Sequence, residues 1–403
     1  MRFLAMLLGA AVICVTSTRG QTLPTDTEKQ IDALFSSIGP KEPGAAALVR
    51  LRQGGRTVYA KGFGVRDLRT GTKIDAQTNF RLASFTKQFT AMAIMLLVHD
   101  KKLRYDQTLT EIFPEFPGYG KNVTVRNLLN HTGGLPDYED LMDAAEKAKG
   151  SPIWSPDHQI HDDQVLALLE KASAAKFTPG TSWSYSNSGY VVLGLIVAKV
   201  SGQSYADFLQ ARIFAPLHMD HTIVFMKGKN EVTNRAYGHS KEGGVLKETD
   251  QSSTSATLGD GGIYSNLEDL AKWDDALWHN TLLSAAEFTP ALTRASLADG
   301  SPTLWPQAPA NDDNLHPGKP VSYGFGWFLD PYKVILRMWH TGSTMGFRTV
   351  IERFVMSGGV TVIVLCNRTD LDPESLALKI FDMAFPIRVD VHPAHTKKLP
   401  SGP

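Results

Sequence analysis

Strand-like segments occur near both ends of the chain, and a long stretch of helical character separates them. The first two flank Gln53-Gly54-Gly55-Arg56, a spacing typical of a β-hairpin. Because strands need partners, we predict one antiparallel sheet built from about residues 25–83 and 258–390. The extended segments are residues 45–52, 57–65, 323–329, 334–339, 347–354 and 360–365.

Helical spacing dominates the sequence between about residues 84 and 257. Apolar residues cover most of the circumference of segment 85–99, which predicts a helix at the centre of the molecule. The predicted fold class is therefore α/β (α+β), with helices flanking the sheet and a mostly helical region inserted into it. A functional site is expected in a cleft between the two parts. Further helices are predicted at residues 25–39, 125–129, 163–175, 188–200, 205–213, 267–277 and 373–384.

The first 20 residues have the pattern of a secretory signal peptide. An apolar run from Phe3 to Val15 follows a basic residue, and small residues lead to Gly20 at cleavage-like spacing. The run is shorter than the ~20 residues that a membrane-spanning helix needs. We predict an exported domain of residues 21–403, periplasmic or secreted, with no stable membrane span.

Composition limits the partners of this domain. It would keep a single cysteine, Cys366, so no internal disulfide is expected. The 41 basic and 41 acidic side chains cancel, which argues against a nucleic-acid partner. The sequence leaves the oligomeric state open.

The first chemical motif is Ser84-Phe85-Thr86-Lys87 at the start of the predicted central helix. Residues three apart share one helix face, so the Lys87 amine can reach the Ser84 oxygen. A serine hydroxyl needs a base to become a nucleophile, and a lysine in a dry site can serve when its pKa is lowered. Alone, the spacing is weak evidence, because a solvated helix start would show it too.

The second motif is Tyr185-Ser186-Asn187, just before an apolar helix. A phenol beside a lysine can exist partly as phenolate and relay the serine proton to a leaving group. The Asn187 amide can orient Lys87 and a substrate carbonyl. The same sequence pattern would also arise from a buried tyrosine followed by an asparagine that caps a helix.

The third motif is His340-Thr341-Gly342-Ser343, at the end of a strand-like run. Gly342 permits close backbone approach, and the Ser343 N–H can join the Ser84 N–H as an oxyanion hole. A second His-Thr-Gly at residues 131–133 follows a helix, and we interpret it as a structural turn.

Two other hydrolytic designs fit less well. An α/β-hydrolase needs a Gly-x-Ser-x-Gly turn between a strand and a helix, and the sequence contains none. A metal site would draw on His158, His161, Asp162 and Asp163, but these lie in a loop entering a helix, and no His-Glu-x-x-His occurs. No metal and no organic cofactor is expected.

Together, Ser-x-x-Lys, Tyr-x-Asn and His-Thr-Gly in this order resemble the serine β-lactamase and penicillin-binding-protein superfamily. The likeness is to its β-lactamase-related branch, which contains class C β-lactamases, D-alanyl-D-alanine carboxypeptidases, D-aminopeptidases and esterases. It covers about residues 25–385, including segments 128–136, 261–265 and 323–327.

The resemblance implies a role for each motif. Ser84 would be the acylated nucleophile of an ester or amide hydrolase, with Lys87 and Tyr185 sharing acid and base duties. The substrate-binding residues would be Asn187, which positions the substrate, His340, which lines the cleft at the sheet edge, Thr341, Gly342, and Ser343, which gives the second oxyanion N–H.

One residue departs from the family pattern. His340 stands where efficient β-lactamases and carboxypeptidases of the superfamily usually have the lysine of Lys-Thr-Gly. An imidazole is a weaker anchor for a substrate carboxylate, so the resemblance favours acyl transfer at Ser84 over β-lactam turnover. The alternative is a non-catalytic or sensor-type module that binds, or is acylated, without turnover.

Overall fold

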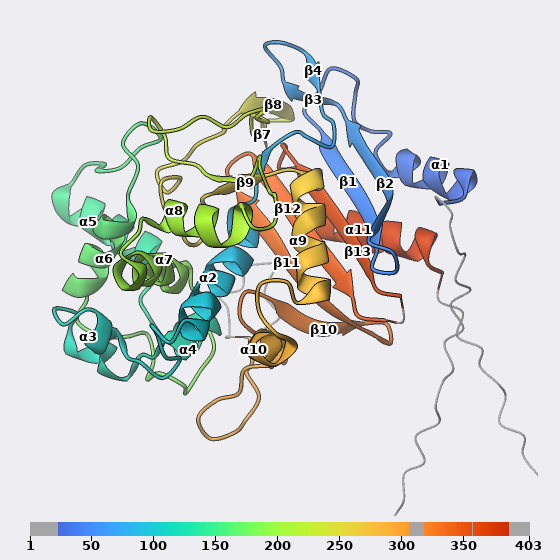
Figure 1. Ribbon diagram of the computed structural model, residues 1–403. Helices are drawn as coiled ribbons and strands as arrows, with labels where there is room; N and C mark the ends of the chain where they lie inside the picture. Colours follow the sequence, from blue (N-terminus) through green and yellow to red (C-terminus); the bar gives the residue numbers. More distant parts are fainter. Residues whose placement is uncertain (1–22, 306–317, 357, 387–403) are drawn as a thin grey trace, which may run out of the picture.

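A six-stranded antiparallel sheet joins the two ends of the chain (Figure 1). The computed structural model describes residues 23–305, 318–356 and 358–386, so the predicted signal peptide lies outside the described residues. The strand order is β10-β11-β12-β13-β1-β2, which confirms the predicted sheet from both chain ends. The strands are β1 (Ala45–Leu51), β2 (Arg56–Phe63), β10 (Phe328–Tyr332), β11 (Ile335–Thr344), β12 (Phe347–Phe354) and β13 (Val360–Cys366).

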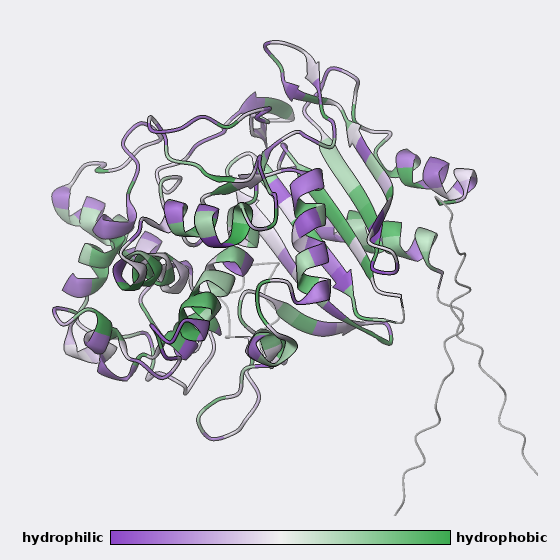
Figure 2. Ribbon diagram, in the orientation of Figure 1, coloured by the Kyte–Doolittle hydropathy of each residue, from purple (hydrophilic) through white to green (hydrophobic). Residues whose placement is uncertain are grey.

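The central strands β1 and β13 are buried on both faces. Their sequences are nearly continuous apolar runs, and Ala45 pairs with Cys366 at one end of the antiparallel register. Successive side chains point to opposite faces, so Ala47 and Val49 join one core while Ala46 and Leu48 join another. Hydrophobic residues accordingly dominate these strands in Figure 2.

Helices cover both faces of the sheet. The two terminal helices, α1 (Thr25–Leu34) and α11 (Pro373–Ala384), pack on one face. On the other face lie α9 (Leu267–His279), which crosses the sheet in Figure 1, and the helical region. Both terminal helices contribute apolar side chains to the core under β1 and β13. Hydrophobic packing therefore holds these helices against the sheet.

The helical region is built around α2 (Lys87–His99). Residues 87–97 of this helix are all buried, as its apolar circumference predicted, and it packs against α7 (Asn187–Ser201). Among the described residues, no helix has both the length and the apolar character needed to cross a bilayer. The other helices are α3 (Leu109–Ile112), α4 (Val125–Leu129), α5 (Tyr138–Lys149), α6 (Asp162–Lys171), α8 (Tyr205–Leu209) and α10 (Ala285–Phe288), with short turns η1 (Ala83–Thr86), η2 (Gly118–Asn122), η3 (Gln210–Phe214) and η4 (Thr289–Leu292).

Some elements differ from the sequence prediction. A hairpin of β7 (His239–Glu242) and β8 (Val245–Glu248) lies where only helices and loops were predicted, because its strands are short and mostly polar. Its turn at Gly243-Gly244 has positive φ at both residues, as such hairpins require. Strand β10 begins five residues later than predicted, and helix α5 was not predicted. The remaining strands are β3 (Val65–Asp67), β4 (Thr72–Lys73), β5 (Phe80–Arg81), β6 (Ile223–Val224) and β9 (Ile263–Ser265).

Candidate active site

Ser84 lies in η1, the short turn that connects β5 to the central helix α2. The preceding residue, Ala83, has φ of 50°, a left-handed conformation that is uncommon for a residue with a side chain. The strand β11 runs close beside this turn: a Cβ on Gly342 would lie 2.0 Å from the Leu82 carbonyl oxygen. The Thr349 hydroxyl donates to the same carbonyl at 2.8 Å. Gly342 therefore permits the close approach that its sequence context predicted.

Lys87 is the first residue of α2 and is fully buried. Its Nζ donates to Ser84 Oγ at 3.0 Å, to Asn187 Oδ1 at 2.9 Å and to the Asp260 carbonyl oxygen at 3.1 Å. Burial lowers the pKa of Lys87 to about 8, although the negative charges of nearby carboxylates oppose this shift. The amine is thus within reach of the serine oxygen and is neutral in part near pH 7.

Tyr185 completes the group around the serine oxygen. Its hydroxyl hydrogen-bonds the Ser84 side chain, and Lys87 Nζ lies 4.9 Å from the centre of its ring. Burial raises the pKa of the Tyr185 phenol, so the neutral phenol is favoured over the phenolate. The Ser186 side chain caps α7 by accepting from the Gly189 N–H at 3.0 Å. This cap fixes the turn that presents Tyr185 and Asn187.

His340 does not line the pocket, contrary to the role implied by the resemblance. It is 1% exposed, its Nδ1 lies 2.6 Å from the Thr341 carbonyl oxygen and its Nε2 lies 3.0 Å from the Tyr323 hydroxyl. The carbonyl requires a proton on Nδ1, so Nε2 accepts from Tyr323. Burial lowers the pKa of His340 to about 3. The imidazole is therefore neutral, and the hydrogen bonds of both nitrogens are made inside the protein.

A solvent-open pocket lies beside Ser84. It brings together residues from the three sequence motifs, namely Ser84, Asn187 and Ser343, while Thr341 and Gly342 lie beside it on β11 and are absent from its wall. Most of the wall is polar, which suits a substrate with hydrogen-bonding groups. The wall is formed by Arg81, Ala83, Ser84, Tyr138, Glu139, Asn187, Thr254, Thr257, Asp260, Gly261, Ser343 and Thr344.

Comparison with known proteins agrees with this geometry. The family model described as Beta-lactamase matches residues 31–384. Penicillin-binding protein 4* of Bacillus subtilis (strain 168) is 32% identical over 389 residues, which cover 92% of this chain and 79% of the relative. The chain belongs to the Beta-lactamase family. The family membership that the motifs indicated is thereby confirmed. This family includes serine hydrolases.

Solved structures share the fold of this chain. An octameric penicillin-binding protein homologue from Pyrococcus abyssi superposes with a TM-score of 0.70 at 25% identity, covering 89% of this chain and 76% of that chain. A D-amino acid amidase from Ochrobactrum anthropi SV3, in complex with L-phenylalanine, gives a TM-score of 0.70 at 24% identity, covering 89% and 96%. The predicted fold class is confirmed by these likenesses.

The second His-Thr-Gly of this chain lies behind the turn that carries Tyr185. His131 Nδ1 accepts from the Ser186 N–H at 3.1 Å, and its ring centre is 4.5 Å from that of Tyr185. His131 is 1% exposed and has φ of 64°. The residues 131–133 thus form a turn, as predicted, and this turn supports the segment that carries Tyr185.

Sequence reasoning missed most of the pocket wall. Asp260 precedes Gly261, which the motif search did include, but a single aspartate beside glycines carries little signal. Tyr138 and Glu139 begin helix α5, which was not predicted. The residues weighed as a metal site have structural contacts instead: Asp162 begins α6 and accepts from the Leu258 N–H at 3.0 Å.

Proposed function

We propose that this protein is an exported serine hydrolase that cleaves an ester or amide through an acyl-enzyme on Ser84. The observation that carries the proposal is the buried Lys87 amine, 3.0 Å from Ser84 Oγ, with a pKa lowered to about 8. A neutral amine at that distance is a competent base for a serine hydroxyl. The signal-like N-terminus and the penicillin-binding relatives support export.

The first half-reaction forms the acyl-enzyme. As Ser84 Oγ attacks the substrate carbonyl carbon, its proton passes to Lys87 Nζ, and the carbonyl oxygen becomes an oxyanion. The backbone N–H groups of Ser84 and Ser343 stabilise that oxyanion. The bond to the leaving group then breaks, and the leaving group takes a proton from the Tyr185 hydroxyl, which in turn receives the proton held by Lys87.

The second half-reaction releases the acid product. Water attacks the acyl carbon and gives its proton to the neutral Lys87 amine, and Ser84 Oγ leaves with that proton, returned from Lys87 directly or through the Tyr185 hydroxyl. The raised pKa of Tyr185 supports proton donation by this phenol, with Lys87 as the resting base. The resemblance implied that Lys87 and Tyr185 share acid and base roles, whereas we assign the base to Lys87 and the acid to Tyr185. No cofactor enters either step.

The neutral His340 argues against a substrate whose recognition depends on a carboxylate at β11. A buried imidazole bonded to Tyr323 offers no positive charge to such a group. We therefore place short esters and amides ahead of β-lactams as substrates. A sensor that is acylated without turnover remains the competing function.

The deciding experiment pairs covalent labelling with turnover. A fluorophosphonate probe is expected to label Ser84, and p-nitrophenyl butyrate is expected to release p-nitrophenolate over many turnovers. Labelling with a single burst and no turnover would favour the sensor, and the absence of both would favour a binding module. The matched control is Ser36→Ala, because Ser36 is an exposed serine whose hydroxyl bonds only a local carbonyl.

A further inference from the structure

The segment that carries Asp260 is bonded to the turn that carries Ser84. The Leu82 N–H donates to the Ile263 carbonyl oxygen at 2.8 Å, and the Ile263 N–H donates to the Thr86 hydroxyl at 3.3 Å. These two bonds lie on either side of Ser84 in the sequence. Asp260, a few residues before Ile263, is therefore held in a fixed position beside the serine.

Asp260 presents two different groups to the site. Its backbone carbonyl oxygen accepts from Lys87 Nζ at 3.1 Å, and the residue lines the same pocket as Ser84 and Asn187. Asp260 is 7% exposed, and its Oδ1 has no hydrogen-bond partner among the described residues, while the Thr257 side chain hydrogen-bonds the carboxylate. A buried carboxylate oxygen without a partner is costly unless a donor from the pocket completes its hydrogen bonds.

The cations that act on Asp260 have other partners. Arg81 is 4% exposed, and its guanidinium donates to the Ser255 side chain at 2.5 Å and to the Ser255 carbonyl oxygen at 3.1 Å. The Lys87 amine donates to three oxygens, none of which belongs to the Asp260 carboxylate. Burial raises the pKa of Asp260, and the charges of Lys87 and Arg81 oppose this shift. Within the described chain the carboxylate thus forms no ion pair, and its Oδ1 is available to a donor.

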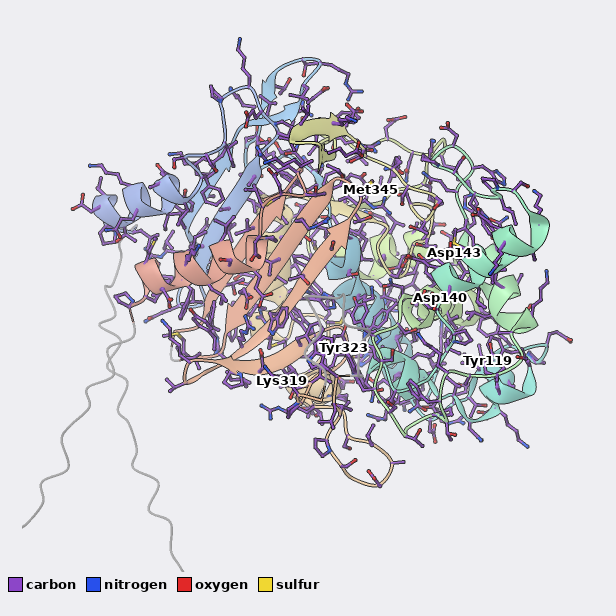
Figure 3. All side chains as sticks on the ribbon, turned by 180° about the vertical axis from the view of Figure 1, so that it is seen from behind. Tyr119, Asp140, Asp143, Lys319, Tyr323 and Met345 are labelled. Carbon is purple, nitrogen blue, oxygen red and sulfur yellow. The ribbon has the colours of Figure 1, made fainter. Side chains whose placement is uncertain are left out.

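The pocket is open to solvent between the start of α5 and the end of β11. Figure 3 shows these two borders, because Asp140 follows the pocket residue Glu139 on α5, and Met345 follows the pocket residue Thr344 after β11. Most of the residues that line the pocket between these borders are polar. Water can therefore reach Asp260 once a leaving group has departed.

We propose that Asp260 holds the water molecule that hydrolyses the acyl-enzyme on Ser84. The inference rests on the proposed function, since it concerns the second half-reaction of the same site. One O–H of the water donates to Asp260 Oδ1, and the other points towards Lys87 Nζ, which the Asp260 carbonyl holds nearby. An ordered water needs at least two polar partners, and the carboxylate and the amine supply them.

Hydrolysis then moves one proton through Lys87. The water oxygen forms a bond to the acyl carbon while one of its protons passes to the neutral Lys87 amine. The bond between the acyl carbon and Ser84 Oγ breaks, and Ser84 Oγ takes that proton from Lys87. The other O–H, which donates to Asp260, leaves as the hydroxyl of the acid product. Asp260 thus fixes the direction of attack and keeps its own protonation state.

Acylation does not use this water, because Ser84 is then the nucleophile. Burial lowers the pKa of Lys87, and the negative charge of Asp260 opposes this shift. Loss of the Asp260 charge would therefore leave more of the amine neutral near pH 7. The two half-reactions should respond in opposite directions: acylation is kept or becomes faster, whereas deacylation becomes slower.

The test compares the first turnover with the later ones. In Asp260→Asn an amide with two N–H donors replaces an oxygen acceptor, so the water loses its partner. After rapid mixing with p-nitrophenyl butyrate, we expect a burst of p-nitrophenolate within about threefold of the wild-type rate, followed by steady turnover that is slower by roughly 10²-fold. Mass spectrometry should show the butyryl group accumulating on Ser84. An equal loss in both phases, or steady turnover at the wild-type rate, would overturn the proposal.

A second nucleophile separates a missing water from a damaged site. Hydroxylamine is a stronger nucleophile than water and needs no carboxylate to attack an ester. Because the acyl-enzyme of Asp260→Asn is intact, hydroxylamine should raise its steady turnover by a factor at least about tenfold larger than in wild type. An equal factor in both proteins would contradict a role for Asp260 in holding the water.

Asp137→Asn is the matched control for charge. The Asp137 carboxylate also acts on the Lys87 charge, but the residue is absent from the pocket wall. It caps α5 by accepting from the Glu139 N–H at 2.9 Å, a role that asparagine fills equally well. Both variants should move the rise of ester kcat/KM to lower pH, and only Asp260→Asn should accumulate the acyl-enzyme. Accumulation in both would assign the effect to the charge on Lys87 and contradict the proposal.

Failure of the proposed function would look different. Neither wild type nor Asp260→Asn would then form a butyryl adduct on Ser84. A water held by another residue would instead leave the adduct of Asp260→Asn turning over at the wild-type rate.

Discussion

The two walls of the pocket differ in what they contribute. The helical wall, formed where α2 and α7 begin, brings a hydroxyl, an amine and an amide within hydrogen-bond distance through Ser84, Lys87 and Asn187. The strand wall, formed by β11, brings Ser343 to the pocket but keeps His340 turned away and bonded to Tyr323. The first wall holds the groups that we propose react with the substrate, whereas the second presents the uncharged Ser343 and Thr344 to the pocket.

This difference separates reaction from selection. The groups that would break an acyl bond are buried and linked to one another, so their geometry depends on the core around α2. The acidic side chains of the pocket lie elsewhere, at Asp260 and on the first turn of α5. A fold can keep one set of reacting groups while the residues that line the rest of the pocket differ.

The largest expected effect concerns the helical wall. Ser84→Ala should lower turnover of p-nitrophenyl butyrate by roughly 10³-fold or more, because the loss of a nucleophile removes the covalent route. Circular dichroism and thermal unfolding should remain close to wild type, since Ser84 is only partly buried. Ser36→Ala should keep full activity. Turnover retained by Ser84→Ala would move the nucleophile elsewhere.

Tyr185→Phe is expected to have the next largest effect. Removal of the hydroxyl takes away the proton donor while the ring keeps its packing against His131. We expect a loss of about 10²-fold in kcat for an amide or anilide, and a smaller loss for p-nitrophenyl esters, whose leaving group needs no proton. Tyr332→Phe, which removes a hydroxyl bonded to Asp382, is the control. Equal losses for both leaving groups would argue against Tyr185 as the acid.

A pH profile tests the base on the same wall. With the pKa of Lys87 lowered to about 8, the neutral amine becomes more abundant as pH rises. The ester kcat/KM should therefore increase about tenfold from pH 7 to pH 9 and then level off. Lys87→Arg should lack this rise, because a guanidinium keeps its proton over the whole range. A flat wild-type profile would rule out a lysine base.

A substitution of His340 on the strand wall should change the stability of the protein more than its catalytic rate. His340→Leu removes the hydrogen bond between the imidazole and the buried Tyr323 hydroxyl, which keeps Tyr190 as a partner, and this should cost about 1 kcal/mol of unfolding free energy with only a small change in ester turnover. The pKa of His340 is lowered to about 3, so wild type loses stability as the unfolded imidazole gains a proton below pH ~6.5.

The His340→Leu variant has no imidazole to protonate at this position. The difference in unfolding free energy between wild type and this variant, measured by urea titration, should therefore become smaller from pH 7 to pH 5. His279→Leu, at the exposed end of α9, should change stability at pH 7 by less than about 0.5 kcal/mol. A large loss of kcat in His340→Leu with unchanged stability would contradict our conclusion that this imidazole is buried and does not line the pocket.

Much of the fold followed from local patterns. The apolar runs at residues 45–52 and 360–365 predicted strands, and the segment 85–99 predicted the central helix, because buried elements have strong periodicity or continuous apolar character. The hairpin β7–β8 was missed because its strands are short and polar, so that only its glycine pair marked it.

The candidate site was predicted in part for similar reasons. Ser84 and Lys87 are three residues apart where η1 leads into α2, so their proximity could be predicted from helical spacing. The orientation of His340 could not be predicted in this way, because it depends on a hydrogen bond between its Nε2 and the Tyr323 hydroxyl. Asp260 is 173 residues from Lys87 in sequence, and only tertiary structure brings its carbonyl to the amine.

Mass spectrometry of the acylated protein tests the central claim most directly. The chain is mixed with p-nitrophenyl butyrate, quenched in acid within the first turnovers, digested and compared with Ser84→Ala and Lys87→Arg. The account predicts a butyryl adduct on the peptide that contains Ser84, absent from Ser84→Ala and formed much more slowly by Lys87→Arg. An adduct on another residue, or formation at the wild-type rate in Lys87→Arg, would contradict it.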